Sequence, residues 1–118
     1  MTLDEYNAFC ARLPATTHVV QWGGAHVWKV GGKVFAIAGR NGSADFAVTF
    51  KCSDMAFQIL KDQEGLRSAP YLAARGMSWI QRQSDDSMDD EALRDYIRES
   101  HRLVAAKLPK RIRMAIDV

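Results

Sequence analysis

Histidine is the residue type in this sequence best suited to bind a metal or move a proton. The three histidines, His18, His26 and His101, stand apart, and no HxxxH, HExxH or Cys/His cluster surrounds them. A metal site needs several such ligands at a characteristic spacing. We therefore expect surface or hydrogen-bonded histidines, with no metal and no cofactor.

Other reactive residue types also fail to form a catalytic group. Ser100 and His101 are adjacent, but neighbours on a helix point in different directions. The five carboxylates within residues 85–91 suit a solvated helix start better than an acid–base pair, and they lack the central glycine of a calcium loop. Cys10 and Cys52 are typical of small buried hydrophobes, although a disulfide stays open. We expect that the chain is not an enzyme.

The stretch VWKVGGKVFAIAG, residues 27–39, raises the question of a phosphate-binding loop. Such a loop leads from a strand into a helix, whose N-terminus holds the anion. Gly31-Gly32 instead joins two segments of strand-like pattern, and no GxGxxG or GxxxxGK[ST] is present. A type I′ hairpin turn, which needs positive φ at both central positions, explains the glycines better.

Basic residues form the remaining group that could do chemistry. Residues 102–113 contain five basic side chains and no acid, while residues 85–91 are acidic. Basic groups neutralise phosphates, and an aromatic ring can stack on a base. The alternative is that the lysines and arginines are ordinary surface residues and that Trp79 is core. The candidate contacts to DNA are Lys29, Lys51, Arg75, Trp79, Arg82, Lys107, Lys110 and Arg111.

The elements that must position these residues follow from periodicity and turn signals. Thr2 and Glu5 form a capping box before a helix over 3–13, which Pro14 ends. Period-two segments separated by glycine-rich turns then predict an antiparallel meander. Its four strands are THVVQW (17–22), HVWKV (26–30), KVFAIA (33–38) and FAVTFK (46–51).

The second half of the chain reads as alternating helices and one strand. Ser53 caps a helix over 54–63, with Gly65 at its C-terminal end. The pattern then predicts a short helical turn over 70–76, a fifth strand over 78–83, and a long helix over 88–107 that begins with a capping box at Ser87 and Asp90 and stops at Pro109. The sequence thus predicts a single α+β domain with helices on one face of the sheet.

The turn at Gly31-Gly32 also predicts which side chains share a face. It places Val30 opposite Lys33 and Trp28 opposite Phe35, so that Trp28, Val30, Phe35 and Ile37 lie on one face. The phenylalanines of the fourth strand should meet the helices. The opposite face should be open and wetter, and it carries Lys29, Thr49 and Lys51.

Composition is ordinary for a globular domain of 118 residues, with 47% hydrophobic residues, 25% charged residues and a net charge of +2. We expect one domain over 1–118 with a basic C-terminal segment, 107–118. No apolar run approaches the roughly 20 residues of a membrane helix, and the N-terminus lacks the basic region of a signal peptide. The expected compartment is the cytoplasm, without membrane contact.

Four motifs together resemble one family. They are VWKVGGKVFA (27–36), FKCSD (50–54), APYLAARG (69–76) leading to Trp79, and SHRLVAAKLPK (100–110). In order and spacing the chain resembles the MmcQ/YjbR family of small bacterial proteins, from the first helix to Lys110. The resemblance implies a frataxin-like (CyaY-like) α+β fold and a "double-wing" arrangement suggestive of DNA binding. Frataxins carry an acidic ridge that this chain lacks, so iron binding is not expected.

Three hypotheses on function follow. The first is a DNA-binding module that contacts phosphates through the open sheet face and the basic tail. The second is a protein-interaction module that binds a partner, or a second copy of itself, through the sheet face or the last helix. The third, with least support, is a small-molecule binder with a pocket near Trp22, Trp79 and His26.

Overall fold

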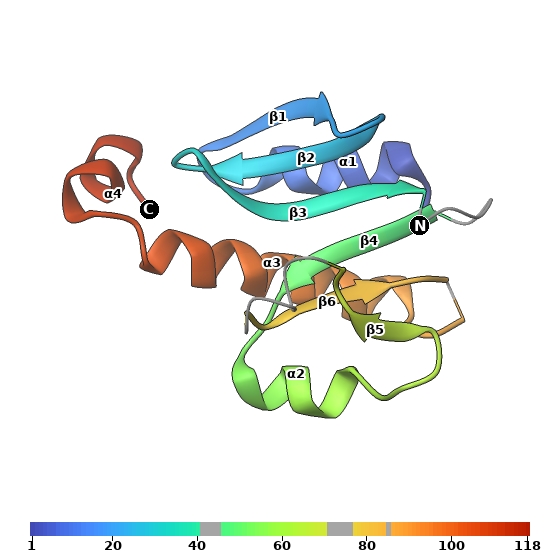
Figure 1. The fold of residues 1–118 in the computed structure, drawn as a ribbon. Coiled ribbons are helices and arrows are strands. Elements are labelled where there is room, and N and C mark those ends of the chain that lie inside the picture. Colours follow the sequence, from blue (N-terminus) through green and yellow to red (C-terminus); the bar gives the residue numbers. More distant parts are fainter. Residues whose placement is uncertain (41–45, 71–76, 85) are drawn as a thin grey trace.

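The computed structural model describes residues 1–40, 46–70, 77–84 and 86–118. These residues form one six-stranded sheet and four helices (Figure 1). In chain order the elements are α1 (Leu3–Arg12), β1 (Thr16–Gln21), β2 (Ala25–Val30), β3 (Lys33–Arg40), β4 (Phe46–Lys51), α2 (Asp54–Leu60), β5 (Leu66–Ser68), β6 (Trp79–Arg82), α3 (Asp90–Ala106) and α4 (Lys110–Ile116). The predicted α+β class is confirmed.

The sheet has the strand order β1-β2-β3-β4-β6-β5, and every adjacent pair is antiparallel. The predicted meander of four strands is therefore correct. The sequence analysis missed β5, because its three residues are too few to show a period of two. The predicted strand over 78–83 is β6, and it lies between β4 and β5. The predicted helical turn over 70–76 falls, from residue 71 on, outside the described residues.

Helix α1 begins as its sequence predicts and ends one residue early. The Thr2 side chain accepts from the Glu5 backbone N–H, while the Glu5 carboxylate accepts from the Thr2 N–H, which completes the capping box. Tyr6 and Cys10, four residues apart, are fully buried against the sheet. Tyr6 also donates its hydroxyl to the His26 carbonyl at 3.0 Å, which ties the helix to β2.

A β-bulge corrects the predicted faces of the β2–β3 hairpin. Val30 pairs with Lys33 as predicted, but Trp28 pairs with Ala36 rather than with Phe35. Phe35 is the extra residue on β3, so the alternation shifts by one beyond it. Ala36 and Ala38 then lie on the helix-covered face in place of Ile37.

Helices α1 and α3 lie behind the sheet in Figure 1, and they cover the face that carries Phe46 and Phe50. Phe46 meets Tyr6 of α1, and Phe50 stacks on Tyr96 of α3 with ring centroids 5.1 Å apart. The phenylalanine side thus packs on helices, as predicted. The opposite face is drier than expected, because only 6% of Thr49 is exposed.

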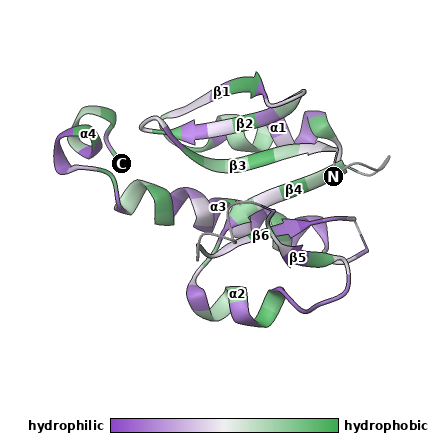
Figure 2. Cartoon of the chain, in the orientation of Figure 1, coloured by the Kyte–Doolittle hydropathy of each residue, from purple (hydrophilic) through white to green (hydrophobic). Residues whose placement is uncertain are grey.

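Helix α3 begins two residues later than predicted. Asp89, not Ser87, is its N-cap, and its carboxylate accepts from the Ala92 N–H. The Ser87 hydroxyl instead donates to the Ser84 carbonyl. Apolar and polar residues alternate along α3 in Figure 2, and the buried positions include Ser100. Ser100 donates to the Phe35 carbonyl and accepts from the Lys51 N–H, so it joins α3 to two central strands.

The end of α2 differs from expectation, whereas α3 ends at Ala106, with Lys107 as its C-cap, close to the predicted residue 107. Helix α2 has the predicted Ser53 N-cap but ends at Leu60, and Gly65 lies in the later turn before β5. The predicted stop of the long helix before Pro109 is confirmed, and Pro109 is also the N-cap of α4, a helix that the sequence analysis did not predict. Within the described ranges, no helix combines the length and apolar character that crossing a bilayer requires.

Candidate functional site

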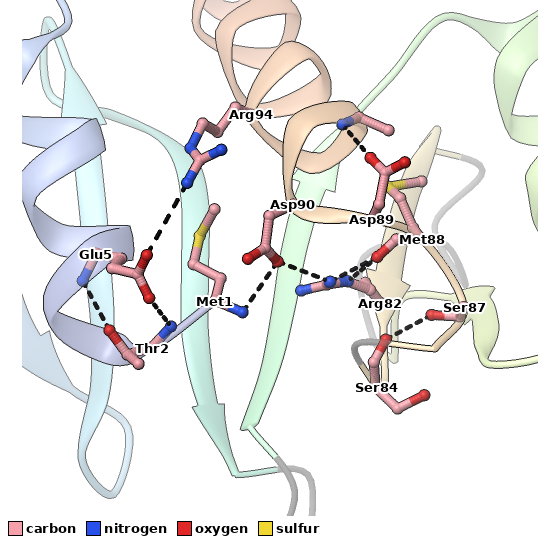
Figure 3. A network of polar contacts seen from close by, with 11 residues as sticks. Met1, Thr2, Glu5, Arg82, Ser84, Ser87, Met88, Asp89, Asp90 and Arg94 are labelled. Carbon is pink, nitrogen blue, oxygen red and sulfur yellow. Dashed lines mark hydrogen bonds and ion pairs between the residues drawn. The ribbon is translucent and has the colours of Figure 1, made fainter.

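Arg82 is not available to DNA, contrary to the sequence-based interpretation. It is 1% exposed on β6. Its guanidinium donates from Nε to the Met88 carbonyl at 3.0 Å and from Nη2 to Asp90 Oδ1 at 3.1 Å (Figure 3). The side chain alternation of β6 places it on the core face, and the loop before α3 covers it. Arg82 is a structural residue.

Asp90 joins three parts of the fold. Its Oδ1 accepts from the Met1 ammonium at 2.9 Å and from Arg82, and both are drawn in Figure 3. The Met1 ammonium first, and then Arg82, hold the pKa of Asp90 below its ordinary value of 3.8. Asp90, in the acidic start of α3, thus connects the N-terminus and β6 to α3 through hydrogen bonds.

Trp79 is core rather than a platform for base stacking. Only 4% of it is exposed, at the start of β6 opposite Lys51. Its indole Nε1–H is buried and has no hydrogen-bond acceptor among the described residues. A buried donor without an acceptor is rare in a native protein, so this atom requires an explanation.

Among the lysines predicted to contact DNA, Lys51 and Lys107 line one pocket, whereas Lys29 lies outside it. Lys29 is half-buried on β2 and pairs in register with Val34 of β3. Val34 lines a pocket together with Lys51 and Lys107. Arg75, another predicted contact, lies outside the described residues.

Lys51 and Lys107 lie close together where β4 and α3 end. Burial lowers the pKa of Lys51, and the neighbouring Lys107 lowers it further, while Asp54 acts in the opposite direction. Lys33, which the sequence analysis did not select, lines the same pocket. Its position directly after the Gly31-Gly32 turn was the available signal. None of the three lysines forms an ion pair with a carboxylate that the structure describes.

Helix α4 adds more basic side chains at this end. Lys110, Arg111 and Arg113 are exposed on it. The helix lies beside the β2–β3 turn (Figure 1), and the contact is close. A Cβ on Gly31, where φ is +57°, would lie 2.5 Å from Leu108 Cδ1 and 3.1 Å from Ile112 Cγ2. We call Lys33, Lys51, Lys107, Lys110 and Arg111 together the basic end. Arg113 instead lines a separate hollow with Asp95, Glu99 and Asp117.

The arginines elsewhere on α3 are paired with carboxylates. Arg98 contacts Asp95 at 2.8 Å, Arg102 contacts Glu99, and Arg94 contacts Glu5 at 4.0 Å. The side chains of the basic end have no such partners in the described part of the chain. Their positive charge is therefore free to meet an external anion.

The three histidines lie in two separate places: His18 and His26 are neighbours, and His101 contacts Pro14. His18 stacks on Trp28 and its Nε2 lies 3.0 Å from His26 Nδ1. Partial burial, and then His26, lower the pKa of His18. His101 Nε2 donates to the Pro14 carbonyl at 2.8 Å. In the ranges that the structure describes, no three His, Cys, Asp or Glu side chains are grouped to hold an ion.

The cysteines are free and buried. Burial raises the pKa of Cys10 to about 12 and that of Cys52 to about 11. Since the thiolate is the nucleophile, neither side chain is suited to covalent chemistry at neutral pH.

The pocket of the third hypothesis is only partly assembled. Trp22 and His26 do line one pocket, of about 480 Å³, at the end of the sheet where β1 turns into β2. Trp79 lines a different pocket, with Lys51. The three residues therefore do not form one site.

The fold and the site together define a small α+β protein with basic side chains gathered at one end. The YjbR family model matches residues 11–103, so the chain belongs to the YjbR family. No curated protein matches it. Among solved structures, the chain is similar to the protein DR2400 of Deinococcus radiodurans, whose domain is of the type DUF419. That likeness has a TM-score of 0.85 and 19% identity and covers 99% of this chain and 88% of DR2400, so it shows the fold alone.

Proposed function

We propose that the chain is a DNA-binding module that contacts duplex phosphates through its basic end. The observation that carries this proposal is the gathering of Lys33, Lys51 and Lys107 around one pocket, with Lys110 and Arg111 on the adjoining α4, none of them in an ion pair with a described carboxylate. Lysine and arginine that lack internal partners release counterions from DNA when they meet its phosphates. The family resemblance, with its double-wing description, points the same way.

The mode of binding follows from the residues that the basic end lacks. Trp79, the aromatic residue nearest these lysines in the prediction, is buried and cannot stack on an unpaired base. The exposed Trp22 follows β1, at the other end of the hairpin from Lys33. We therefore expect the protein to contact phosphates with little sequence preference. Because the described part of the basic end presents no aromatic ring to stack on bases, its affinity for duplex DNA should exceed its affinity for single-stranded DNA.

Fluorescence anisotropy with labelled duplex DNA at several salt concentrations tests the proposal. The variant K110Q/R111Q should bind more weakly, and the slope of log K against log salt should fall by about 0.9 for each phosphate contact removed. The variant K61Q/R94Q is the matched control, because it removes two positive charges from the C-cap of α2 and from α3, outside the basic end. Absence of binding at low salt, or equal loss in both variants, would overturn the proposal.

A protein-interaction module is the second candidate. Met55 and Ile59, four residues apart on α2, are 76% and 59% exposed, so one face of this helix is apolar and open. Sedimentation of the wild type and of M55E/I59E tests self-association through this face. A monomer in both cases, with no partner in pull-downs, would remove this candidate.

A further inference from the structure

A pocket of about 310 Å³ lies in the basic end, lined by Lys33, Lys51 and Lys107. It opens where β3 begins, β4 ends, β6 begins and α3 ends. Three lysines supply its charge, and Val34, Val104, Leu108 and Pro109 supply an apolar wall. This combination of apolar lining with a few polar groups is typical of small-ligand sites.

The unpartnered indole of Trp79 belongs to this pocket. Only 4% of Trp79 is exposed, and the residue lines the pocket together with Lys51. The indole N–H can only donate, so only an acceptor can satisfy it. The described protein atoms provide none. A ligand oxygen in the pocket would supply the missing acceptor.

The lysines favour the same kind of ligand. Lys51 and Lys107 are held near each other although their charges repel, and Lys33 adds a third positive charge. The carboxylate near Lys51 is Asp54, which already accepts from the Ser78 hydroxyl. Asp54 lines an adjoining hollow, which shares Lys51 and Lys107, and not the pocket of Trp79. An anion between the lysines would remove their repulsion.

We propose that this pocket binds a small molecule that carries a phosphate monoester on an apolar body. A monoester has up to two charges and three acceptor oxygens, which match several ammonium groups and one N–H. The apolar wall would receive the rest of the ligand. A phosphodiester of duplex DNA carries one charge and is flanked by two sugars, so it suits a recessed pocket poorly. This site would exist whether or not the basic end binds DNA.

Nuclear magnetic resonance of the indole N–H groups tests the site directly, with phenyl phosphate as the probe. The chain has three tryptophans, and the W79F variant identifies the Trp79 resonance by its loss. Phenyl phosphate should shift the Trp79 resonance strongly. The Trp28 resonance is the internal control, because its indole already donates to Asn7 at 2.9 Å. Inorganic phosphate should bind more weakly, and phenol should not bind.

Variants separate this site from DNA binding. K51Q and K107Q should each weaken phenyl phosphate about tenfold, the effect of one charge-assisted hydrogen bond. K110Q/R111Q should leave this affinity unchanged while it weakens duplex binding. No shift of Trp79 at millimolar phenyl phosphate, an equal shift with phenol, or full binding by K51Q/K107Q would each overturn the proposal. Loss of DNA binding alone would leave it standing.

Discussion

Replacement of Arg82 by alanine should destabilise the fold far more than replacement of any exposed arginine. The guanidinium is buried and two of its nitrogens donate to the Met88 carbonyl. Its removal leaves that carbonyl without these donors, which costs about 1–3 kcal/mol. Loss of the two buried methylenes beyond Cβ costs about 1.6 kcal/mol more, at about 0.8 kcal/mol for each.

We therefore expect Arg82→Ala to lower the free energy of unfolding by about 3–5 kcal/mol. A chain of this length has roughly 6–18 kcal/mol in total, at about 0.05–0.15 kcal/mol per residue. Arg82→Met keeps the apolar stem, so it should lose only about 1–3 kcal/mol.

Urea denaturation measures these differences, since the change in midpoint gives the change in stability when the slope is constant. Arg98→Ala is the control: its exposed pair with Asp95 should contribute less than about 0.5 kcal/mol. If Arg82→Ala were as stable as Arg98→Ala, the structural role of Arg82 would be refuted. If Arg82→Met folded normally but lost DNA binding, the original interpretation of Arg82 as a DNA contact would return.

Three further predictions concern titratable groups. The fold lowers the pKa of Asp90, so the ionised side chain stabilises the protein fully above the ordinary pKa of 3.8, and this stability is lost as the pH falls through the lower folded pKa. Asp90→Asn should therefore reduce the fall in urea midpoint that the wild type shows at acid pH. The pKa of Lys51 is lowered because the fold disfavours its charged form, so the charge of Lys51 opposes folding at neutral pH. Lys51→Met should therefore raise the melting temperature at pH 7. It should also remove the gain in stability that the wild type shows as the pH rises toward 10.5. Cys10 and Cys52 should react with a thiol reagent only at the rate of unfolding, and fast labelling of the native protein would contradict their burial.

Much of the fold was predictable because its signals are local. The capping box at Thr2, the glycine pair at 31–32 and the alternation of strand 46–51 each act over a few residues, and they yield the predicted helix start, turn and strand, although both faces of the strand are buried. Strand β5 and helix α4 were missed for the opposite reason. They are short, and the sheet and the β2–β3 turn stabilise them through residues distant in sequence.

The candidate site was harder to predict, because burial depends on tertiary packing. Arg82 and Trp79 looked available on a strand with an open face, yet a loop and the end of α3 cover them. Lys33 was overlooked because its position directly after the Gly31-Gly32 turn places it at one end of a hairpin but does not say which side chains lie near it. Its neighbours in space, Lys51 and Lys107, come from elements 18 and 74 residues further along the chain.

The strand order has a consequence for the route of folding. Strands β1 to β4 pair with their neighbours in sequence, so this part of the sheet can form through short loop closures. Strand β5 has no described strand neighbour except β6, which is made later and must enter between β4 and β5. We expect the transition state to contain the meander while β5 and β6 are still unpaired. Mutations at Ile80 should then speed unfolding, and mutations at Val30 should slow folding.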